Sequence, residues 1–186
     1  MKAKSFLLIA LSCLLVVGCK KSEEKTEPTP PEPSFTKITE DQLKSYFPYI
    51  VGDEFIFRCD VIVEDRILRV DNYSFTNKAG KMIVDVNFIG RERYAHIDGS
   101  NPEYFHIDLK AEVTNNKILK IDSEYEYIIY MPYDSKVPGT YTYDASQNDS
   151  LPEKISLSDV ATIKKDIGLT YYVDDDGYEF YFLKRK

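Results

Sequence analysis

The chain has 186 residues, in which 31 Asp and Glu outweigh 24 Lys and Arg to give a formal net charge of −7. Negative charge repels nucleic-acid phosphates and anionic lipid headgroups, so we expect no nucleic-acid partner and no electrostatic docking on membranes. The three cysteines are too few for a disulfide-rich scaffold or a multi-cysteine metal site.

The amino terminus predicts an export signal. Lys2 and Lys4 precede an apolar run over residues 6–17, which has the length of a secretory signal and is shorter than the roughly 20 residues of a membrane-spanning helix. The run ends in Val-Val-Gly-Cys at positions 16–19, and this ending resembles the lipobox of bacterial lipoproteins. The resemblance implies that residues 1–18 are removed and that Cys19 carries fatty acyl chains such as palmitate.

Removal of the signal would leave 168 of the 186 residues, with the net charge falling from −7 to −9 because Lys2 and Lys4 are lost. This length fits one domain with a tail. Each buried methylene contributes about 0.8 kcal/mol, so two or three acyl chains would hold the protein stably on a membrane. The expected location is the bacterial cell envelope, anchored by lipid in the outer membrane.

The segment 19–34 predicts a disordered tether. After the cysteine it contains four prolines and no apolar side chain, so it has nothing to bury in a core. The residue after the cysteine is Lys20 and not Asp, and in this respect the chain is similar to lipoproteins forwarded to the outer membrane. Ser22-Glu23-Glu24 resembles the short acidic signal by which Bacteroidota lipoproteins reach the cell surface, and the surface-exposed and periplasm-facing orientations both remain open.

The folded domain is expected over residues 35–186 and to begin with one short helix. Thr39 and Gln42 have the spacing of a capping box, while Leu43, Tyr46 and Phe47 follow at helical spacing. Pro48 ends this helix, since proline cannot continue the hydrogen-bond ladder.

Alternating apolar and polar residues predict β-strands over most of the remaining chain. The expected strands cover residues 55–61, 67–75, 82–89, 111–113, 118–121, 124–131, 140–143, 171–173 and 178–183. Residues 144–152 are expected to be a polar loop, and 160–165 either a strand or a helical turn. The fold class is therefore all-β and mainly antiparallel: a single meander barrel or a sandwich of about 8–10 strands with one short N-terminal helix.

Both ends of this domain resemble uncharacterised Bacteroidota lipoproteins. The opening YFPYIVGDEFIF at residues 46–57 and the endings GLTYY at 168–172 and FYFL at 180–183 are similar to that family, whose members usually carry Trp where this chain has Phe55. The resemblance implies an antiparallel β domain, and it supplies no activity.

A short sequence pattern that occurs twice suggests a weak candidate metal site. Tyr-Ala-His-Ile-Asp at 94–98 is followed by Tyr-Phe-His-Ile-Asp at 104–108. If 99–103 is a hairpin loop, His96 faces His106 at a Cβ separation of about 4.5–5.5 Å, and Asp98 or Asp108 adds an oxygen ligand. The favoured alternative is a solvated outer face without metal.

Fifteen tyrosines and no tryptophan suggest a second kind of site. Exposed tyrosine rings can stack on sugars, and the candidates are Tyr125, Tyr127, Tyr141 and Tyr143. The favoured alternative is that these residues are half-buried strand positions. Asp149-Ser150-Leu151 resembles the Asp-Ser/Thr-aliphatic pattern of Bacteroidota O-glycosylation, which makes Ser150 a candidate modification site.

Two further features have structural explanations. Cys59 lies on the apolar side of its strand with Phe55, Phe57 and Val61, so we interpret it as a small buried residue. Asp174-Asp175-Asp176-Gly177 lacks the ligand spacing of a calcium loop, and we interpret it as the turn of a hairpin.

The chain contains no Gly-x-Ser-x-Gly elbow, phosphate loop or dinucleotide fingerprint, the short patterns that mark several enzyme classes. We therefore predict a non-catalytic binding or scaffold module without a cofactor, whose partner is an unknown envelope protein. The alternative is a surface glycan-binding lipoprotein that uses its tyrosine-rich strands. A hydrolase is a less favoured third hypothesis.

Overall fold

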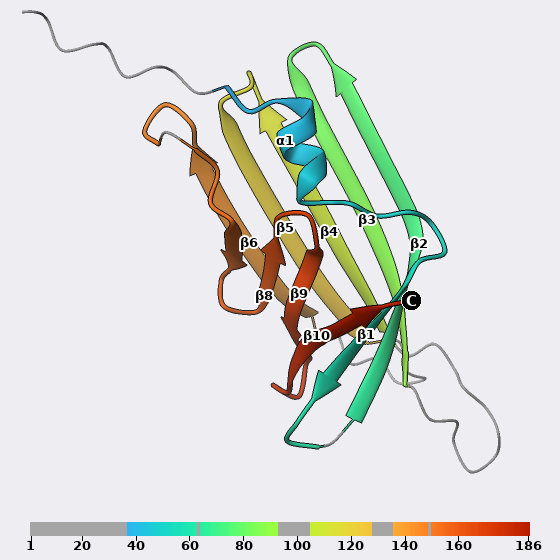
Figure 1. The fold of residues 1–186 in the computed structure, drawn as a ribbon. Helices are drawn as coiled ribbons and strands as arrows, with labels where there is room; N and C mark the ends of the chain where they lie inside the picture. Colours follow the sequence, from blue (N-terminus) through green and yellow to red (C-terminus); the bar gives the residue numbers. More distant parts are fainter. Residues whose placement is uncertain (1–36, 63, 93–104, 128–135, 149) are drawn as a thin grey trace, which may run out of the picture. The chain divides into compact units, whose positions relative to one another are not determined.

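Ten antiparallel strands and one short helix make up the part of the chain that the structure describes (Figure 1). The structure is a computed structural model, and it describes residues 37–186 except 63, 93–104, 128–135 and 149. The elements are α1 (Glu40–Ser45), β1 (Glu54–Cys59), β2 (Glu64–Lys78), β3 (Lys81–Glu92), β4 (Phe105–Thr114), β5 (Ile118–Tyr127), β6 (Lys136–Asp144), β7 (Lys154–Leu157), β8 (Ala161–Lys164), β9 (Gly168–Val173) and β10 (Glu179–Arg185).

The strands form one sheet in the order β6-β5-β4-β3-β2-β1-β10-β9-β8-β7. This sheet curls until its two edges approach each other, which makes a nearly closed barrel and settles the choice between barrel and sandwich. The long strands β2 to β6 form one wall and the short strands β7 to β10 form the other (Figure 1). The predicted antiparallel β fold with one short N-terminal helix is confirmed.

The two edges meet where β6 passes the turn between β7 and β8. The Thr140 backbone N–H donates to the Ser158 hydroxyl, and that hydroxyl donates to the Thr140 carbonyl, both at 3.2 Å. A side chain at Gly139 would overlap Ser123 and approach Val160 within 2.6 Å and the Leu157 carbonyl within 2.9 Å. Glycine at this position therefore lets the barrel close.

Helix α1 covers one end of the barrel. The predicted capping box is present: the Gln42 N–H donates to the Thr39 hydroxyl at 3.2 Å, and the Gln42 side chain accepts from the Thr39 N–H at 2.8 Å. The helix is tied to both walls. The Asp166 N–H donates to the Ser45 carbonyl at 2.7 Å on the side of β7 to β10, and the Asn77 amide of β2 donates to Glu40 at 3.1 Å on the other side.

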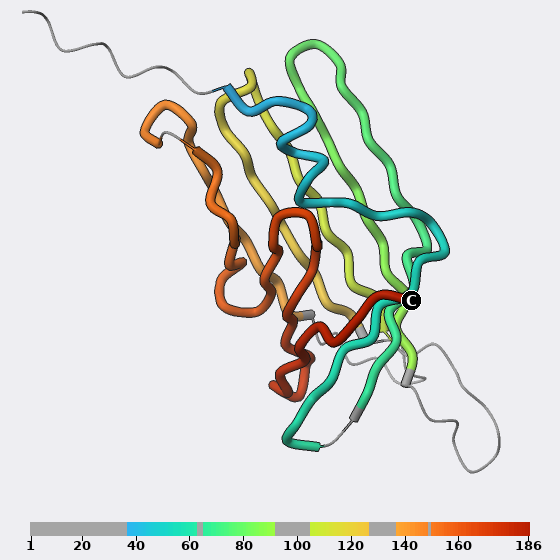
Figure 2. The backbone as a smooth tube through the Cα atoms, viewed as in Figure 1, coloured from blue at the N-terminus to red at the C-terminus, as the bar shows by residue number. Residues whose placement is uncertain are grey.

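Residues 46–53 lead from α1 to β1 and run beside the C-terminal end of the chain (Figure 2). Arg185 donates to the Pro48 carbonyl at 3.2 Å. The Tyr49 hydroxyl accepts the Leu169 N–H at 2.6 Å, which joins this connection to the start of β9. Gly168 has a φ of +91°, and a side chain there would overlap the Tyr49 ring.

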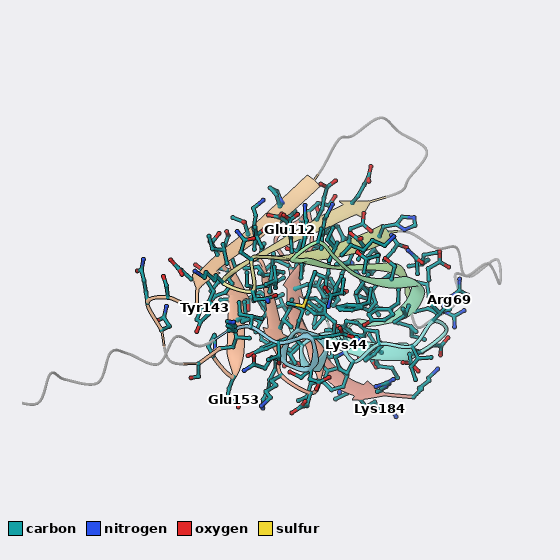
Figure 3. All side chains as sticks on the ribbon, turned by 90° about the horizontal axis from the view of Figure 1, so that it is seen from above. Lys44, Arg69, Glu112, Tyr143, Glu153 and Lys184 are labelled. Carbon is teal, nitrogen blue, oxygen red and sulfur yellow. The ribbon has the colours of Figure 1, made fainter. Side chains whose placement is uncertain are left out.

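The interior of the barrel is filled by side chains (Figure 3). The largest of the fully buried residues are aromatic: Tyr46, Tyr172, Phe47, Phe57, Phe88, Phe105 and Phe180. Their rings pack in chains, as where Tyr172 stacks on Phe180 with 5.0 Å between centroids. Aromatic packing of this kind contributes, together with the buried aliphatic side chains, to the apolar burial that stabilises the domain.

One ion pair lies among these rings. Arg66 and Asp174 are 8% and 2% exposed, and 3.1 Å separates Arg66 Nη1 from Asp174 Oδ2. The guanidinium lies 4.1 Å from the centroid of the Phe180 ring. Asp174 also accepts the N–H groups of Asp176 and Tyr178 at 3.1 and 2.8 Å, so the same carboxylate holds the β9–β10 turn.

Three strand predictions need correction. The separation of the strands predicted at 118–121 and 124–131 was wrong: residues 118–127 form one strand, β5, in which Ser123 continues the inward-facing row, while 128–131 lie outside the described residues. Strand β7 was not predicted, because four residues carry too short an alternation. Val61 lies beyond the end of β1 and is 82% exposed, so it does not share the buried side of Cys59.

Strand β2 shows why its alternation is weak in the sequence. Its pairing with β3 shifts by one residue between Val70 and Asn72. A bulge of this kind changes which face the following residues occupy. Val70 is fully buried and Tyr73 packs against the core, so the inward-facing positions are three residues apart there.

Candidate functional site

Of the predicted pair His96 and His106, the structure describes His106 alone. His106 lies opposite Ile89 of β3 on one side and Glu126 of β5 on the other. His96 and Asp98 lie outside the described residues. Within the described ranges, no three His, Cys, Asp or Glu side chains are grouped so that they could hold a metal ion.

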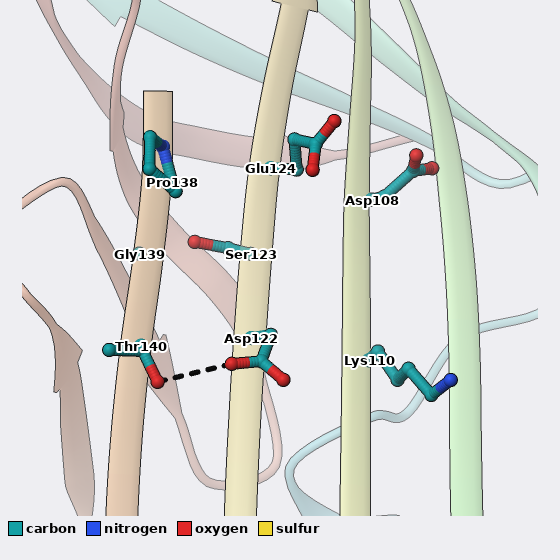
Figure 4. A pocket seen from close by; sticks show the side chains of 8 residues that line it. All are labelled: Asp108, Lys110, Asp122, Ser123, Glu124, Pro138, Gly139 and Thr140. Atoms are coloured by element: carbon teal, nitrogen blue, oxygen red, sulfur yellow. Dashed lines mark hydrogen bonds between the residues drawn. The ribbon is translucent and has the colours of Figure 1, made fainter. Parts of the chain in front are cut away.

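Asp108 instead borders an acidic depression on the outer face of β4, β5 and β6 (Figure 4). The depression has a volume of about 490 Å³, and its lining residues are Asp108, Lys110, Asp122, Ser123, Glu124, Pro138, Gly139 and Thr140. Asp108 and Glu124 are direct cross-strand partners. Like charges in such positions repel each other, so this surface favours a cationic neighbour.

The tyrosines predicted to stack on sugars are mostly inside the barrel. Tyr125 is 3% exposed and stacks on Phe105 with 5.1 Å between ring centroids. Tyr143 is also buried, and Tyr141 is partly buried against the core. Tyr127 belongs to β5, but its side chain lies outside the described set. The three described rings are therefore buried or partly buried strand positions, in line with the favoured alternative for these tyrosines.

Ser150 is exposed and lies beside a cleft at the end of β6. The cleft has a volume of about 400 Å³, and Tyr141, Tyr143 and Ser150 are among the residues that line it. Asp144 organises the loop here by accepting the N–H of Ser146 at 2.8 Å. Solvent exposure is compatible with modification of Ser150, which remains a prediction.

A groove on the outer face of β7 to β10 has the features expected of a ligand site. It has a volume of about 350 Å³, and it is lined by Lys154, Ser156, Asp159, Thr162, Thr170, Tyr171 and Tyr181. We call it the tyrosine groove. Its volume falls at the lower end of the range of about 300–1,000 Å³ that is typical of small-ligand pockets.

The strand register explains how the tyrosine groove forms. Ser156 pairs with Thr162, Thr162 with Tyr171, and Tyr171 with Tyr181, so one row of side chains crosses four strands on the same face. The pairing of β8 with β9 shifts between Thr162 and Ile163, which leaves Thr170 as an extra residue beside Tyr171. Small hydroxyl side chains thus form the floor and the two tyrosines form one wall.

The two tyrosines make an aromatic surface at the edge of the groove. The centroids of their rings are 5.1 Å apart and the rings are inclined at 48°. Tyr181 is 49% exposed, which sets it apart from the other aromatic side chains that the structure describes, since those are buried or partly buried. An exposed ring held in place by a second ring is a suitable platform for stacking.

The surroundings of both tyrosine hydroxyls raise their pKa values. The Tyr181 hydroxyl donates to Glu179, and this hydrogen bond raises the pKa of Tyr181 to about 12. Burial, followed by the negative charge of Glu179, raises the pKa of Tyr171 above its ordinary value. Both groups therefore stay neutral at physiological pH, and the Tyr181 oxygen, whose proton is directed to Glu179, can accept a hydrogen bond from a ligand.

The sequence contained a signal for part of this groove. Symmetric pairing about the predicted turn at 174–177 would place Tyr171 opposite Phe180. In the structure the register is one residue longer, and Tyr171 lies opposite Tyr181. Ser156 and Lys154 had no such signal, because they lie on the unpredicted strand β7. Their position beside the tyrosines depends on the pairing of β8 with both β7 and β9.

The remaining sequence features are structural. Cys59 is a free, fully buried cysteine, which agrees with its interpretation as a small apolar residue. The segment 174–177 forms the turn between β9 and β10, also as interpreted.

The anchor prediction concerns residues outside the described part of the chain, since Cys19 is among residues 1–36. In the part that is described, no helix is both long and apolar enough to cross a membrane. Comparisons of the chain with protein-family models, with curated proteins and with solved structures found no match.

Proposed function

We propose that this protein is a non-catalytic, lipid-anchored binding module of the bacterial cell envelope, and that it binds a glycan in the tyrosine groove. Support for the glycan comes from one observation above all. A half-exposed Tyr181 ring, packed on Tyr171, adjoins hydroxyl groups from three neighbouring strands. Carbohydrates offer apolar ring faces for stacking and many hydroxyls for hydrogen bonds, and the groove provides partners for both.

A binding role rather than a hydrolytic one fits the groove's charge. Glycoside hydrolysis ordinarily uses two carboxyl groups that flank the scissile bond. Asp159 is the carboxylate among the residues that line the groove, while nearby Glu179 accepts the hydrogen bond of Tyr181.

The anchor part of the proposal rests on the lipobox resemblance at residues 16–19. A lipid at Cys19 and a tether over residues 20–34 would confine the domain to one membrane surface. Confinement raises the effective concentration of a binding site toward other components of that surface. A weak individual glycan contact would then suffice for retention.

The glycan proposal is tested by measuring affinity for neutral soluble polysaccharides before and after Tyr181→Ala. Loss of a stacking contact worth about 1 kcal/mol lowers affinity several-fold, and loss of its hydroxyl brings the expected reduction to about tenfold. Leu183→Ala is the matched control, because Leu183 lies on the same strand, is 45% exposed and does not line the groove. Equal affinity of Tyr181→Ala and the unaltered protein would contradict the proposal.

The anchor is tested by Cys19→Ser and cell fractionation. We expect the variant to leave the membrane fraction, because it lacks the sulfur that carries the lipid. Antibody labelling of intact cells then distinguishes the surface-exposed orientation from the periplasm-facing one. Unchanged membrane retention of Cys19→Ser would refute lipid anchoring at this residue.

A second candidate function is a scaffold that docks a basic protein. The observation in its favour is the acidic depression, where Asp108 and Glu124 oppose each other. Affinity isolation of the lipidated protein from its own membranes should recover a stoichiometric partner, and a double variant Asp108→Asn, Glu124→Gln should lose it. Recovery of no such partner would count against the scaffold.

A further inference from the structure

Two lysines adjoin the tyrosine groove as direct cross-strand partners. Lys154 of β7 pairs with Lys164 of β8, and their neighbours Ile155 and Ile163 are fully buried, so both lysines are on the outer face. Residues in this relationship have Cβ atoms about 4.5–5.5 Å apart, and like charges there are destabilising. Lys154 itself lines the groove.

Neither lysine side chain is neutralised within the described part of the chain, where neither forms an ion pair or a side-chain hydrogen bond. Other lysines differ: Lys165, the next residue along, lies 3.9 Å from Glu153, and Lys120 lies 2.8 Å from Asp122. In a chain with net charge −7, two adjacent cations without a carboxylate partner form a distinct local positive site.

The charges around the groove are separated by the row of Ser156, Thr162, Tyr171 and Tyr181. Lys154 and Lys164 lie on the side of this row nearer the β8–β9 turn, as the register shows. Asp159 and Glu179 lie on the other side, nearer the β7–β8 and β9–β10 turns. Successive same-face residues on a strand are roughly 6.7 Å apart, so Lys154 is one such step from Ser156 on β7 and Lys164 is one step from Thr162 on β8.

We propose that the tyrosine groove takes an acidic sugar, with its ring stacked at Tyr181 and its anionic group held between Lys154 and Lys164. This inference rests on the proposed glycan-binding function and adds the class of glycan. An anion bound between the lysines relieves their mutual repulsion, while Asp159 on the opposite side accepts hydrogen bonds from sugar hydroxyls. The anionic group is a ring carboxylate or a ring sulfate, which present the same charge at a similar distance from the ring.

The experiment compares polysaccharides that differ in charge alone. Polygalacturonate is paired with its methyl ester, which removes the carboxylate charge, and dextran sulfate is paired with dextran. Affinity for the purified domain is measured for all four. Two solvent-exposed ion pairs predict about tenfold tighter binding of the acidic member of a pair, and this preference should shrink between about 0.05 and 0.5 M salt because exposed charges are screened.

Lysine variants assign the preference to this site. Lys154→Gln and Lys164→Gln should each reduce the preference for the acidic polysaccharide and leave binding of its neutral counterpart unchanged. Lys120→Gln is the matched control, since it removes an exposed lysine from the outer face of another part of the sheet. Urea unfolding checks that the variants are folded, and removal of one lysine of the opposed pair is expected to cost no stability.

The outcomes separate this inference from the proposal on which it rests. A preference for polygalacturonate or for dextran sulfate that both groove-lysine variants lose supports the inference and identifies the acidic group. Equal binding of charged and neutral members, still weakened by Tyr181→Ala, overturns the acidic-sugar inference and leaves glycan binding intact. A preference that survives in both lysine variants also overturns it, and absence of binding to all four counts against both.

Discussion

Asp174 is the ionic partner of Arg66 inside the barrel, with 3.1 Å between Asp174 Oδ2 and Arg66 Nη1. Burial raises the pKa of Asp174 above its ordinary value, and the Arg66 guanidinium opposes that shift. The pair joins β2 to the β9–β10 turn, so one carboxylate connects the two walls of the barrel.

Loss of one member of this pair is predicted to be costly. Asp174→Ala leaves the Arg66 charge buried and frees the turn, which should lower the free energy of unfolding by about 3–5 kcal/mol. Urea denaturation measures this. The exposed neighbour variant Asp176→Ala should change stability by less than about 0.5 kcal/mol. A double variant Arg66→Met, Asp174→Leu should regain most of the lost stability, and a loss below about 1 kcal/mol in Asp174→Ala would contradict the prediction.

Gly168 and Gly52 allow a matched test of the contact with Tyr49. Both have positive φ, at +91° and +94°, but a side chain at Gly52 meets no atom within 4 Å whereas one at Gly168 overlaps the Tyr49 ring. Gly52→Ala should lower the free energy of unfolding by about 1–2 kcal/mol, the cost of a positive φ for a residue with a side chain. Gly168→Ala should lower the free energy of unfolding by a further 1–3 kcal/mol, roughly the cost of overpacking against the Tyr49 ring. Equal thermal stability of the two variants would show that the contact is unimportant.

The interactions of Glu54 predict that the folded domain loses part of its stability at acid pH. A hydrogen bond from Lys186 at 2.9 Å, with Arg91 at 2.7 Å, lowers the pKa of Glu54 below 4.5. A lowered pKa in the folded state gives stability that is present above the unfolded value and is lost as the pH falls through the folded value.

Urea unfolding at a series of pH values therefore tests the role of Glu54. Glu54→Gln should be less stable than the unaltered protein at neutral pH, and the gap should close as the pH falls below 4.5. Glu153→Gln, which removes a carboxylate that is 78% exposed, should follow the unaltered protein throughout. A gap for Glu54→Gln that is independent of pH would be the contrary result.

The seam between β6 and β7 provides a fourth prediction. Gly139→Ala introduces a methyl group against Ser123, Val160 and the Leu157 carbonyl, and it should cost about 1–3 kcal/mol. Amide hydrogen exchange should accelerate in β6 and β7 more than in β3, because the seam opens before the long strands separate. Uniform acceleration across the sheet would show that the seam is not a separate unit.

Local patterns allowed much of this fold to be predicted. The helix was identified because its capping box involves residues three apart, and most strands were identified because alternation repeats along one segment. The closure of the barrel depends on Gly139 meeting residues of the β7–β8 turn, which are distant in sequence. No local pattern contains that contact, so the barrel and the sandwich were indistinguishable.

The tyrosine groove illustrates the same limit for function. The hairpin that carries Tyr171 and Tyr181 follows from a turn that the sequence marks clearly, but their direct pairing depends on a register one residue longer than that turn implies. Its other half comes from the four-residue strand β7, which carries little periodic signal. Density of tyrosines drew attention to Tyr125 and Tyr143 instead, and those rings are buried because their strands alternate inward at these positions.

The register joins Phe55 of β1 to Arg185 of β10, which has a consequence for biosynthesis. Until β10 leaves the ribosome, the nascent chain can assemble only two fragments, β1 to β6 and β7 to β9, each with an unsatisfied edge. Such edges recruit neighbouring polypeptides, and pairings between distant segments form slowly. The two fragments therefore join only once β10 is available to pair with both β1 and β9, and those two strands are exposed edges in the interval.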